Sequence, residues 1–306
     1  MFREYGVDPA LIPAWADNIL GDFIMKQFGL SRGRLLARVP KDWTSIVREL
    51  HDLETNATKK KKIEVLRNHL GSKFVGRSRE NFIDTRTWLE NAEIDNERVP
   101  FRRILSNVNP RGHDNVLVSN SLSGDLFEEL SGGTDSTHLV KTTANIVTFL
   151  SPILRCATEI KFIDPYFYPA ADRYGPTFKA LLFASKQDRP GKRINRIEIH
   201  VKQDEDHAGT LNGYRTYLPP LVPSGDSVEV FFWEERLPMG LHDRYVLTDL
   251  GGFNFAQGLS TSPTPDPVHR LEQTTFNSIF TKYSAFTQSP EILLKDRILI
   301  PGIAVE

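Results

Sequence analysis

Apolar residues recur at helical spacing in three stretches of the first half of the chain. The first stretch, residues 8–30, predicts one or two helices from Leu11, Ile12, Trp15, Ile19, Leu20, Phe23 and Ile24. The other two, Trp43–Leu53 and about Lys60–Leu70, each predict one helix. The signals after these helices are mixed and rich in turns, with Asn115–Val118 as a candidate short strand. We therefore expect residues 1–135 to form a mainly helical N-terminal region.

The pattern changes after Ser131–Asp135, whose Ser-Gly-Gly-Thr-Asp sequence is typical of a linker. In residues 136–306, short apolar runs alternate with amphipathic helical patterns. The expected strands are Glu159–Tyr166, Arg196–Val201 and Ser227–Trp233, the expected helices are Thr142–Thr158, Pro176–Ser185 and Thr210–Leu218, and the expected hairpin joins Arg244–Thr248 to Gly252–Gln257. Strands that alternate with helices indicate an α/β fold with a mostly parallel sheet covered on both faces.

The carboxyl ends of these strands carry the polar residues of interest. Asp164 lies at the end of the first expected strand, and loops follow His200 and Trp233 near the ends of the next two. Ligands of open α/β sheets bind outside the carboxyl ends of the strands. We expect Asp164, the loop after His200 and the segment after Trp233 to lie at one edge of the sheet.

Composition places the chain among ordinary globular proteins, and its 306 residues favour two domains over one. No apolar run approaches the ~20 residues that a membrane helix needs, and the first residues lack a secretory signal, so we expect a cytoplasmic protein. The single cysteine, Cys156, excludes an internal disulfide and a multi-cysteine metal site. The net charge of −1 is unlike that of proteins that coat nucleic acid, although it leaves room for a local basic groove. Lys59–Lys62 is either the solvated first turn of a helix or a contact for nucleic acid or acidic membrane.

The richest candidate chemistry lies between residues 242 and 249. His242 and Arg244 are two positions apart, so a strand points them to the same side. An imidazole can attack phosphorus or donate a proton, and a guanidinium can hold two phosphate oxygens in fork geometry. Asp249 can orient a histidine if the fold brings its carboxylate to a ring N–H. The alternatives are a structural histidine that bonds to backbone and an arginine that pairs with Asp243 or Asp249.

The spacing His242-x-Arg244-x-x-x-x-Asp249 resembles the His-x-Lys-x-x-x-x-Asp motif of the phospholipase D superfamily, with arginine in place of lysine. Gly258-Leu259-Ser260 follows where that family carries a glycine-serine segment, at a longer spacing, and Ile163–Phe167 looks like the end of the family's first strand. The segment is especially similar to the C-terminal phospholipase D-like domain of MIT-domain-containing proteins and to uncharacterised bacterial relatives. The resemblance implies, for residues 136–306, a phospholipase D-like mixed sheet flanked by helices.

The resemblance has two functional implications. Catalytic members hydrolyse phosphodiesters without a metal, and they need two motifs, in one chain or from two protomers, so that one histidine forms phosphohistidine and another protonates the leaving group. The other candidate here, His200-Val201-Lys202, has His207 where the aspartate belongs. Catalysis by His242 therefore requires a homodimer. The MIT-type domains, in contrast, look like binders of lipids or protein partners.

Three further residues complete the predicted site. Asp164 is either a polar group at the mouth of the site or a turn residue before Pro165. Ser260 either donates its hydroxyl to a phosphate or lies exposed in a solvated loop. The resemblance implies that Glu272 restrains the guanidinium of Arg244, as a downstream carboxylate does in the family.

Metal chemistry is not expected. Glu159-Ile160-Lys161 matches the Glu-x-Lys core of metal-dependent nucleases of the restriction type. That chemistry needs an acidic residue on the preceding strand to share the metal ion, but a helix is expected there, and we expect Lys161 to end in solvent. Asp204–His207 lacks a second ligand cluster, which favours a solvated acidic loop. We therefore predict no metal and no cofactor.

The leading hypothesis is a phosphodiester-recognising protein, with nucleic acid as the favoured ligand and metal-independent cleavage by a dimer. In that hypothesis His242 is the nucleophile or acid, Arg244 clamps the phosphate and Asp249 is the orienting carboxylate. The alternative is a catalytically degenerate module that binds a protein partner, nucleic acid or an anionic lipid headgroup, as part of a larger complex. Proteins that carry such domains also suggest a role in bacterial defence.

Overall fold

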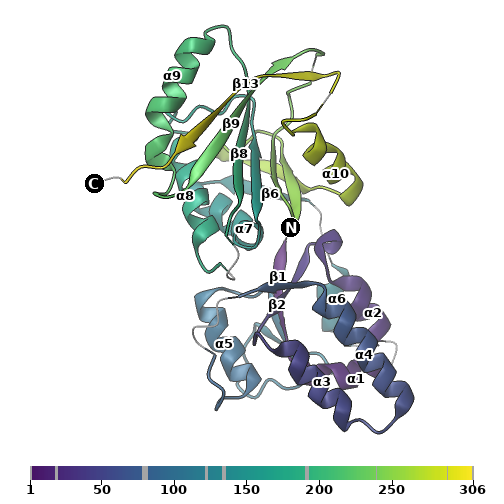
Figure 1. Ribbon diagram of the computed structural model, residues 1–306. Coiled ribbons are helices and arrows are strands. Elements are labelled where there is room, and N and C mark those ends of the chain that lie inside the picture. The colour runs from purple at the N-terminus through teal and green to yellow at the C-terminus, as the bar shows by residue number, and fades with distance from the viewer. Residues whose placement is uncertain are drawn as a thin grey trace. The chain divides into compact units, whose positions relative to one another are not determined.

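The computed structural model describes residues 2–17, 20–77, 82–120, 123–132, 136–189, 193–238, 240–287 and 289–304. The chain folds into two compact units. The N-terminal unit comprises residues 2–134 and 188–191, and the C-terminal unit comprises residues 135–187 and 192–306. Each unit has its own sheet (Figure 1). Within the described ranges, no helix has both the length and the apolar character needed to cross a membrane.

A five-stranded sheet forms the centre of the N-terminal unit, and all its strand pairs are parallel. The strands are β1 (Arg3–Val7), β2 (Arg34–Arg38), β3 (Phe74–Gly76), β4 (Arg103–Ser106) and β5 (Val116–Val118). The helices are α1 (Ile12–Ala16), α2 (Leu20–Gln27), α3 (Trp43–Leu53), α4 (Ala57–Gly71), α5 (Trp88–Arg98) and α6 (Gly124–Ser131), with short 3₁₀ turns η1 (Pro9–Leu11) and η2 (Leu30–Arg32). The order β3-β2-β1-β4-β5 is that of a doubly wound α/β fold.

The sheet corrects our interpretation of residues 1–135 as mainly helical. The expected helices are present, and the candidate strand at Asn115–Val118 became β5, but the other four strands went unrecognised. One reason is that β1 carries a charged residue in its interior. Glu4 is buried there because the Arg77 guanidinium binds it, at 2.8 Å, and also binds Asp95, at 2.8 Å. A charged residue that is neutralised by a distant partner does not look like a core position in the sequence.

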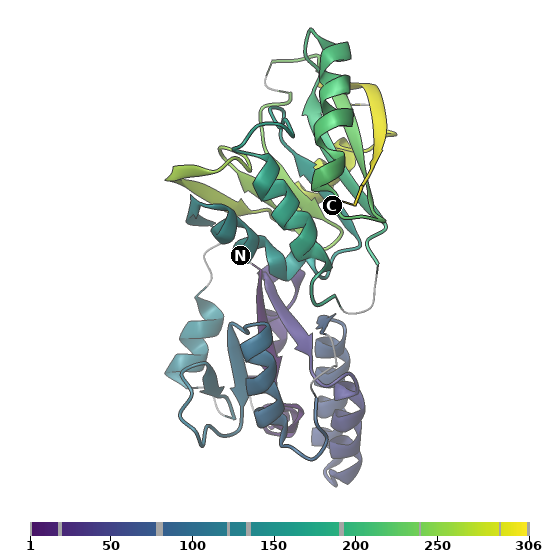
Figure 2. The ribbon, with the colours of Figure 1, turned by 90° about the vertical axis from the view of Figure 1, so that its left-hand side faces the viewer.

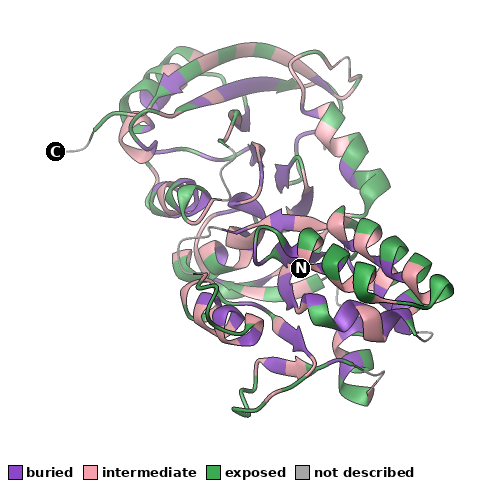
Figure 3. Ribbon diagram, turned by 60° about the horizontal axis from the view of Figure 1, so that its bottom comes forward, coloured by how far each residue is buried: buried purple, intermediate pink, exposed green. Residues whose placement is uncertain are grey.

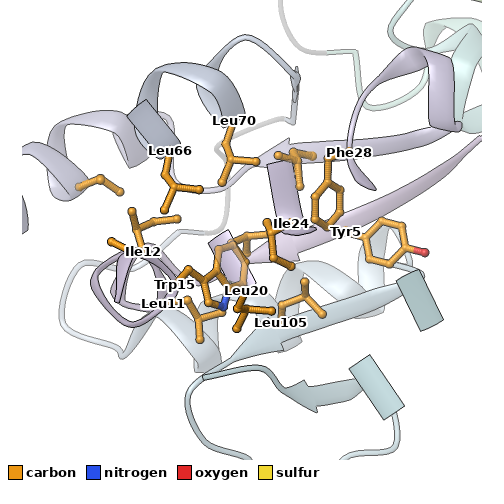
Figure 4. Packing of buried hydrophobic residues seen from close by; sticks show 14 of the residues in the cluster. Tyr5, Leu11, Ile12, Trp15, Leu20, Ile24, Phe28, Leu66, Leu70 and Leu105 are labelled. Carbon is orange, nitrogen blue, oxygen red and sulfur yellow. The ribbon is translucent and has the colours of Figure 1, made fainter. Parts of the chain in front are cut away.

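The core of this unit gathers apolar side chains from the helices around β1 and β4. Tyr5, Trp15, Leu66 and Leu105 belong to one buried cluster (Figure 4). The expectation that the lysine run is a solvated helix start agrees with the structure, because Lys61 and Lys62 are exposed on α4. The start of α4 is capped by Asn56, whose side chain accepts hydrogen bonds from two backbone N–H groups.

The C-terminal unit contains an eight-stranded mixed sheet in the order β13-β9-β8-β7-β10-β11-β12-β6. The strands are β6 (Ser136–Lys141), β7 (Glu159–Ile163), β8 (Arg196–Lys202), β9 (Ser227–Glu235), β10 (Tyr245–Thr248), β11 (Gly251–Phe255), β12 (Ser262–Arg270) and β13 (Ile292–Pro301). The helices are α7 (Thr143–Leu154), α8 (Gly175–Lys186), α9 (His207–Tyr217) and α10 (Gln273–Lys282), with a 3₁₀ turn η3 (Pro219–Leu221). The α/β class is confirmed, but the expectation of a mostly parallel sheet is wrong. The pairs β7–β8 and β8–β9 are parallel and the other five strand pairs are antiparallel, because β6, β12 and β13, which the sequence analysis did not recognise, all pair antiparallel. The sequence predicted β7 to β11 and α7 to α9, and it missed β6, β12, α10 and β13.

Helices cover both faces of this sheet (Figures 1 and 2). On one face, aromatic pairs join each helix to a strand: Phe149 of α7 with Phe253, Phe178 of α8 with Phe162, and Tyr214 of α9 with Phe232. On the other face, Phe276 of α10 packs in a cluster with Ile163, Phe231 and Trp233. The central strands are mostly buried and the outer faces of the helices mostly exposed (Figure 3).

Strand β7 is the point at which the strand order changes direction. The parallel strands β8 and β9 follow on one side of β7, and the antiparallel strand β10 lies on the other side. Because β10 runs antiparallel to β7, it begins at the edge where β7 ends. Crevices at such switch points are the usual ligand sites of open α/β sheets.

Candidate functional site at the end of β7

Asp164 and Arg244 lie side by side at this switch point. Tyr245 pairs with Ile163, so the residue before β10 stands next to the residue after β7. The Arg244 Nε atom is 3.8 Å from Asp164 Oδ1. Two backbone N–H groups, of Tyr166 and Leu259, donate to the buried Asp164 carboxylate at 3.0 and 3.4 Å. Burial raises the pKa of Asp164, although these hydrogen bonds and Arg244 oppose that shift.

The loop after β11 packs directly on this pair. Gly258 has φ +74°, and a Cβ at that position would lie 2.2 Å from Asp164 Oδ2 and 2.7 Å from Arg244 Cδ. Only glycine therefore fits both the backbone conformation and the space. The loop continues to Ser260, whose hydroxyl donates to the Gln257 carbonyl at 3.4 Å. The structure thus brings Ser260 into the loop that closes over Asp164 and Arg244.

The Arg244 guanidinium is held in place but keeps free donors. Its Nη1 donates to the Ala256 carbonyl at 2.7 Å, and its Cζ lies 5.1 Å from the centre of the Tyr166 ring. Its Nε has no hydrogen-bond partner, and Nη2 donates to no described residue. The side chain is 18% exposed. A fixed guanidinium with an unpaired nitrogen is a group that can bind an anion without losing much side-chain freedom.

A second charged pair, Lys141 and Asp266, lies beside the same loop. Lys141 Nζ donates to the carbonyls of Gln257 and Gly258, at 3.2 and 3.1 Å, and is 3.4 Å from Asp266 Oδ2. Both side chains are fully buried. Burial lowers the pKa of Lys141, while Asp266 opposes that change. Sequence reasoning missed this pair, because a lone lysine and an aspartate between two prolines carry no motif.

Asp249 does not lie where the predicted mechanism requires it. Its carboxylate accepts hydrogen bonds from the backbone N–H groups of Thr158 and Glu159, at 2.8 and 3.1 Å, and from the Thr158 hydroxyl, at 2.8 Å. These contacts fix the start of β7, at the far end of β10 from His242. His242 is exposed and has no hydrogen bond to a described residue. The proposed orienting role of Asp249 is therefore incompatible with the structure, because the four-residue strand β10 separates the two side chains.

Glu272 is likewise separated from Arg244. It is exposed at the start of α10, next to Leu271, whose N–H donates to the Gly252 carbonyl. Gly252 lies near the start of β11, paired with Leu247, at the same far end of β10 as Asp249. Glu272 therefore lies at the other end of β10 from Arg244 and, contrary to expectation, does not restrain it. Asp164 is the carboxylate that faces the guanidinium.

A cavity of about 1050 Å³ opens at the carboxyl ends of β7, β8 and β9. Its lining comes from the segment after each strand, together with Arg173 and one side of α9. The lining residues are Pro165–Tyr168, Arg173, Lys202–Asp206, Gly209, Thr210, Tyr214, Glu234 and Glu235. The cavity lies at the edge that the sequence indicated, and Tyr166 connects it to Arg244.

His200 is a buried structural residue and not part of a second motif. The Trp233 indole N–H donates to its Nδ1 at 3.0 Å, so Nε2 carries the proton and donates to Glu198 at 3.0 Å. Its ring stacks on Phe231 with centroids 4.7 Å apart. Burial lowers the pKa of His200, although Glu198 opposes the shift. With both ring nitrogens engaged and its side chain fully enclosed, the His200 imidazole has no access to a phosphorus atom.

This burial predicts a dependence of stability on pH. The unfolded chain protonates His200 below about pH 6.5, and the lowered pKa means that the folded unit takes up this proton only at a lower pH. The free energy of unfolding should therefore fall as the pH falls below about 6.5, by up to ~1.4 kcal/mol per pH unit. His200→Phe should flatten that dependence, and the exposed His242→Ala should keep it. Urea unfolding between pH 5 and pH 8 measures the difference, and equal slopes in wild type and His200→Phe would contradict the assignment.

The expectation that Lys161 ends in solvent is wrong. Its ammonium is buried: Nζ lies 3.0 Å from Glu198 Oε2 and donates to the Tyr283 carbonyl at 2.6 Å. Lys161 therefore belongs to a buried network with Glu198 and His200.

In the part of the chain that the structure describes, no three His, Cys, Asp or Glu side chains cluster closely enough to hold a metal ion.

Comparisons with protein-family models, with curated proteins and with solved structures found no match to this chain.

Proposed function

We propose that the C-terminal unit is a phospholipase D-like module that recognises a phosphodiester group at the switch point between β7 and β10. The observation that carries this proposal is the state of Arg244. Its guanidinium is oriented by the Ala256 carbonyl, Asp164 and Tyr166, and its Nη2 donates to no described residue. A fixed guanidinium with free N–H groups suits phosphate oxygens.

Nucleic acid is the favoured phosphodiester. Two cations, Arg173 and Arg244, and two partly exposed tyrosines, Tyr166 and Tyr168, lie at or beside the same cavity. A third cation of the lining, Lys202, is paired with Glu235. Cations with interleaved aromatic rings are typical of surfaces that bind single-stranded nucleic acid. A lipid headgroup would use the cations but leave the rings without a role.

Binding without cleavage is supported by the surroundings of His242. A phosphohistidine mechanism needs an oriented imidazole, and the predicted orienting carboxylate, Asp249, is committed to the start of β7. Cleavage therefore requires that a second protomer supply the missing groups. This hypothesis of a catalytic homodimer is kept as the second candidate function, because the exposed His242 is free to face a partner.

Arg244→Ala should weaken binding of a short single-stranded oligonucleotide by about 10- to 100-fold, the loss expected for about 1.5–3 kcal/mol of charge-assisted hydrogen bonding. Fluorescence anisotropy of an end-labelled strand in EDTA measures this. Arg297→Ala is the matched control, because Arg297 is an exposed arginine on the edge strand β13. Equal affinity of wild type and Arg244→Ala would overturn the proposal.

The same reactions, separated on a denaturing gel, test the second candidate. Cleavage by wild type that disappears in His242→Ala would establish a metal-independent phosphodiesterase and direct attention to the dimer. Binding without any cleavage would leave the non-catalytic module as the function.

A further inference from the structure

The cavity beside Arg244 combines aromatic side chains with an acidic rim. Tyr166 and Tyr168 are 50% and 37% exposed, and both line the cavity. Five carboxylates surround them, from Asp204, Glu205, Asp206, Glu234 and Glu235. The cavity volume, about 1050 Å³, is large enough for a drug-sized molecule.

Most of the rim carboxylates are engaged within the protein. Asp204 accepts from the Thr210 hydroxyl, and Asp206 from the Gly209 N–H. Glu235 is 2.6 Å from Lys202 Nζ, and Glu234 is 3.4 Å from Lys295 Nζ. Even so, their summed charge makes the cavity unfavourable for phosphate groups. The rim therefore favours an uncharged, flat part of a ligand inside the cavity and leaves the phosphate to Arg244.

Tyr166 links these two regions. Its ring lines the cavity, and Arg244 lies 5.1 Å from the ring centre. A phosphate on Arg244 would therefore sit within the length of one nucleotide of the aromatic wall. A base can stack on such a ring whatever its identity, because each base has a π face.

We propose that the cavity receives a base of single-stranded nucleic acid, stacked on Tyr166, while Arg244 holds the adjacent phosphate. The proposal rests on the proposed phosphodiester recognition and names its ligand class. A strand in a duplex keeps its bases stacked and paired, so it presents only its backbone to this site. The expected preference is for single strands that carry bases.

The test compares a short labelled single strand with an abasic strand of the same length and phosphate count. Wild type should bind the abasic strand about tenfold more weakly, the loss expected for one stacked base. Tyr166→Ala removes both the stacking ring and one contact of Arg244. It should therefore weaken binding of the base-carrying strand more than binding of the abasic strand, and bind the two strands with about equal affinity. Tyr166→Phe, which keeps the ring, should bind both strands as wild type does.

Tyr217→Ala is the matched control, because Tyr217 is 49% exposed on α9 and does not line the cavity. Equal binding of base-carrying and abasic strands by wild type, with both lost in Arg244→Ala, would overturn the stacking proposal and leave phosphate recognition intact. Binding of both strands that is unaffected by Arg244→Ala would overturn the proposed function itself. A preference for the base-carrying strand that persists in Tyr166→Ala would also overturn stacking on this ring.

Discussion

Glu198→Ala should lower the free energy of unfolding of the C-terminal unit by about 3–5 kcal/mol, the cost of leaving a buried charge without its partner. The Glu198 side chain is 1% exposed and joins three partners: Lys161 at 3.0 Å, His200 at 3.0 Å and Arg196 at 2.9 Å. Burial raises the pKa of Glu198, but His200 and Lys161 outweigh burial and hold the pKa below its usual value. Among the residues that the structure describes, removing the carboxylate leaves the Lys161 ammonium with the Tyr283 carbonyl and the Phe280 ring.

Urea unfolding followed by the ¹⁹F signal of fluorotryptophan at position 233 measures this loss. Trp233 suits the purpose because it is buried in this unit and its indole donates to His200. Glu229→Ala is the control: Glu229 pairs with Arg196 and Arg297 near the surface, and its removal should cost less than about 1 kcal/mol. The double change Lys161→Met with Glu198→Leu should recover part of the lost stability, since apolar residues can replace a buried ion pair, while the His200 Nε2–H stays without its acceptor. A loss in Glu198→Ala no larger than that in Glu229→Ala would contradict the buried network.

Gly258→Ala should destabilise the same unit and also weaken phosphate binding. An alanine there must adopt a left-handed φ, at about 1–2 kcal/mol, and its Cβ would lie 2.2 Å from Asp164 Oδ2 and 2.7 Å from Arg244 Cδ. Relieving that overlap should add about 1–3 kcal/mol. Because the contact is with Asp164 and Arg244 themselves, we expect the affinity for a single strand to fall about tenfold or more, the equivalent of about 1.4 kcal/mol.

Gly225→Ala separates the two contributions. Gly225 has φ +84° in the same unit, and a Cβ there meets nothing within 4 Å. This variant should therefore show the backbone cost alone and bind a single strand as wild type does. If the two alanine variants lose the same stability and the same affinity, then the loop does not pack on Asp164 and Arg244 as described.

The sequence by itself determined the α/β class of the C-terminal unit and the sheet edge at which Asp164 and the cavity lie. Apolar runs of the length of a strand, separated by amphipathic helical patterns, predicted β7, β8 and β9 in this order. Because Asp164 directly follows β7, this order places it at the carboxyl end of that strand. Two short apolar runs, Ile292–Leu294 and Ile298–Ile300, also contained a signal for β13, which our sequence prediction missed.

The tertiary structure alone decided which charged residues meet. Lys141 and Asp266 are 125 positions apart in numbering and are buried together only because β6 pairs with β12. Asp249 is only seven positions from His242 in the sequence. The two side chains lie far apart because His242 precedes the extended strand β10 and Asp249 follows it. Buried charges depend on distant partners for neutralisation, and a local pattern contains no information about such partners. For the same reason the sheet of the N-terminal unit, where Arg77 neutralises Glu4, emerged only from the folded chain.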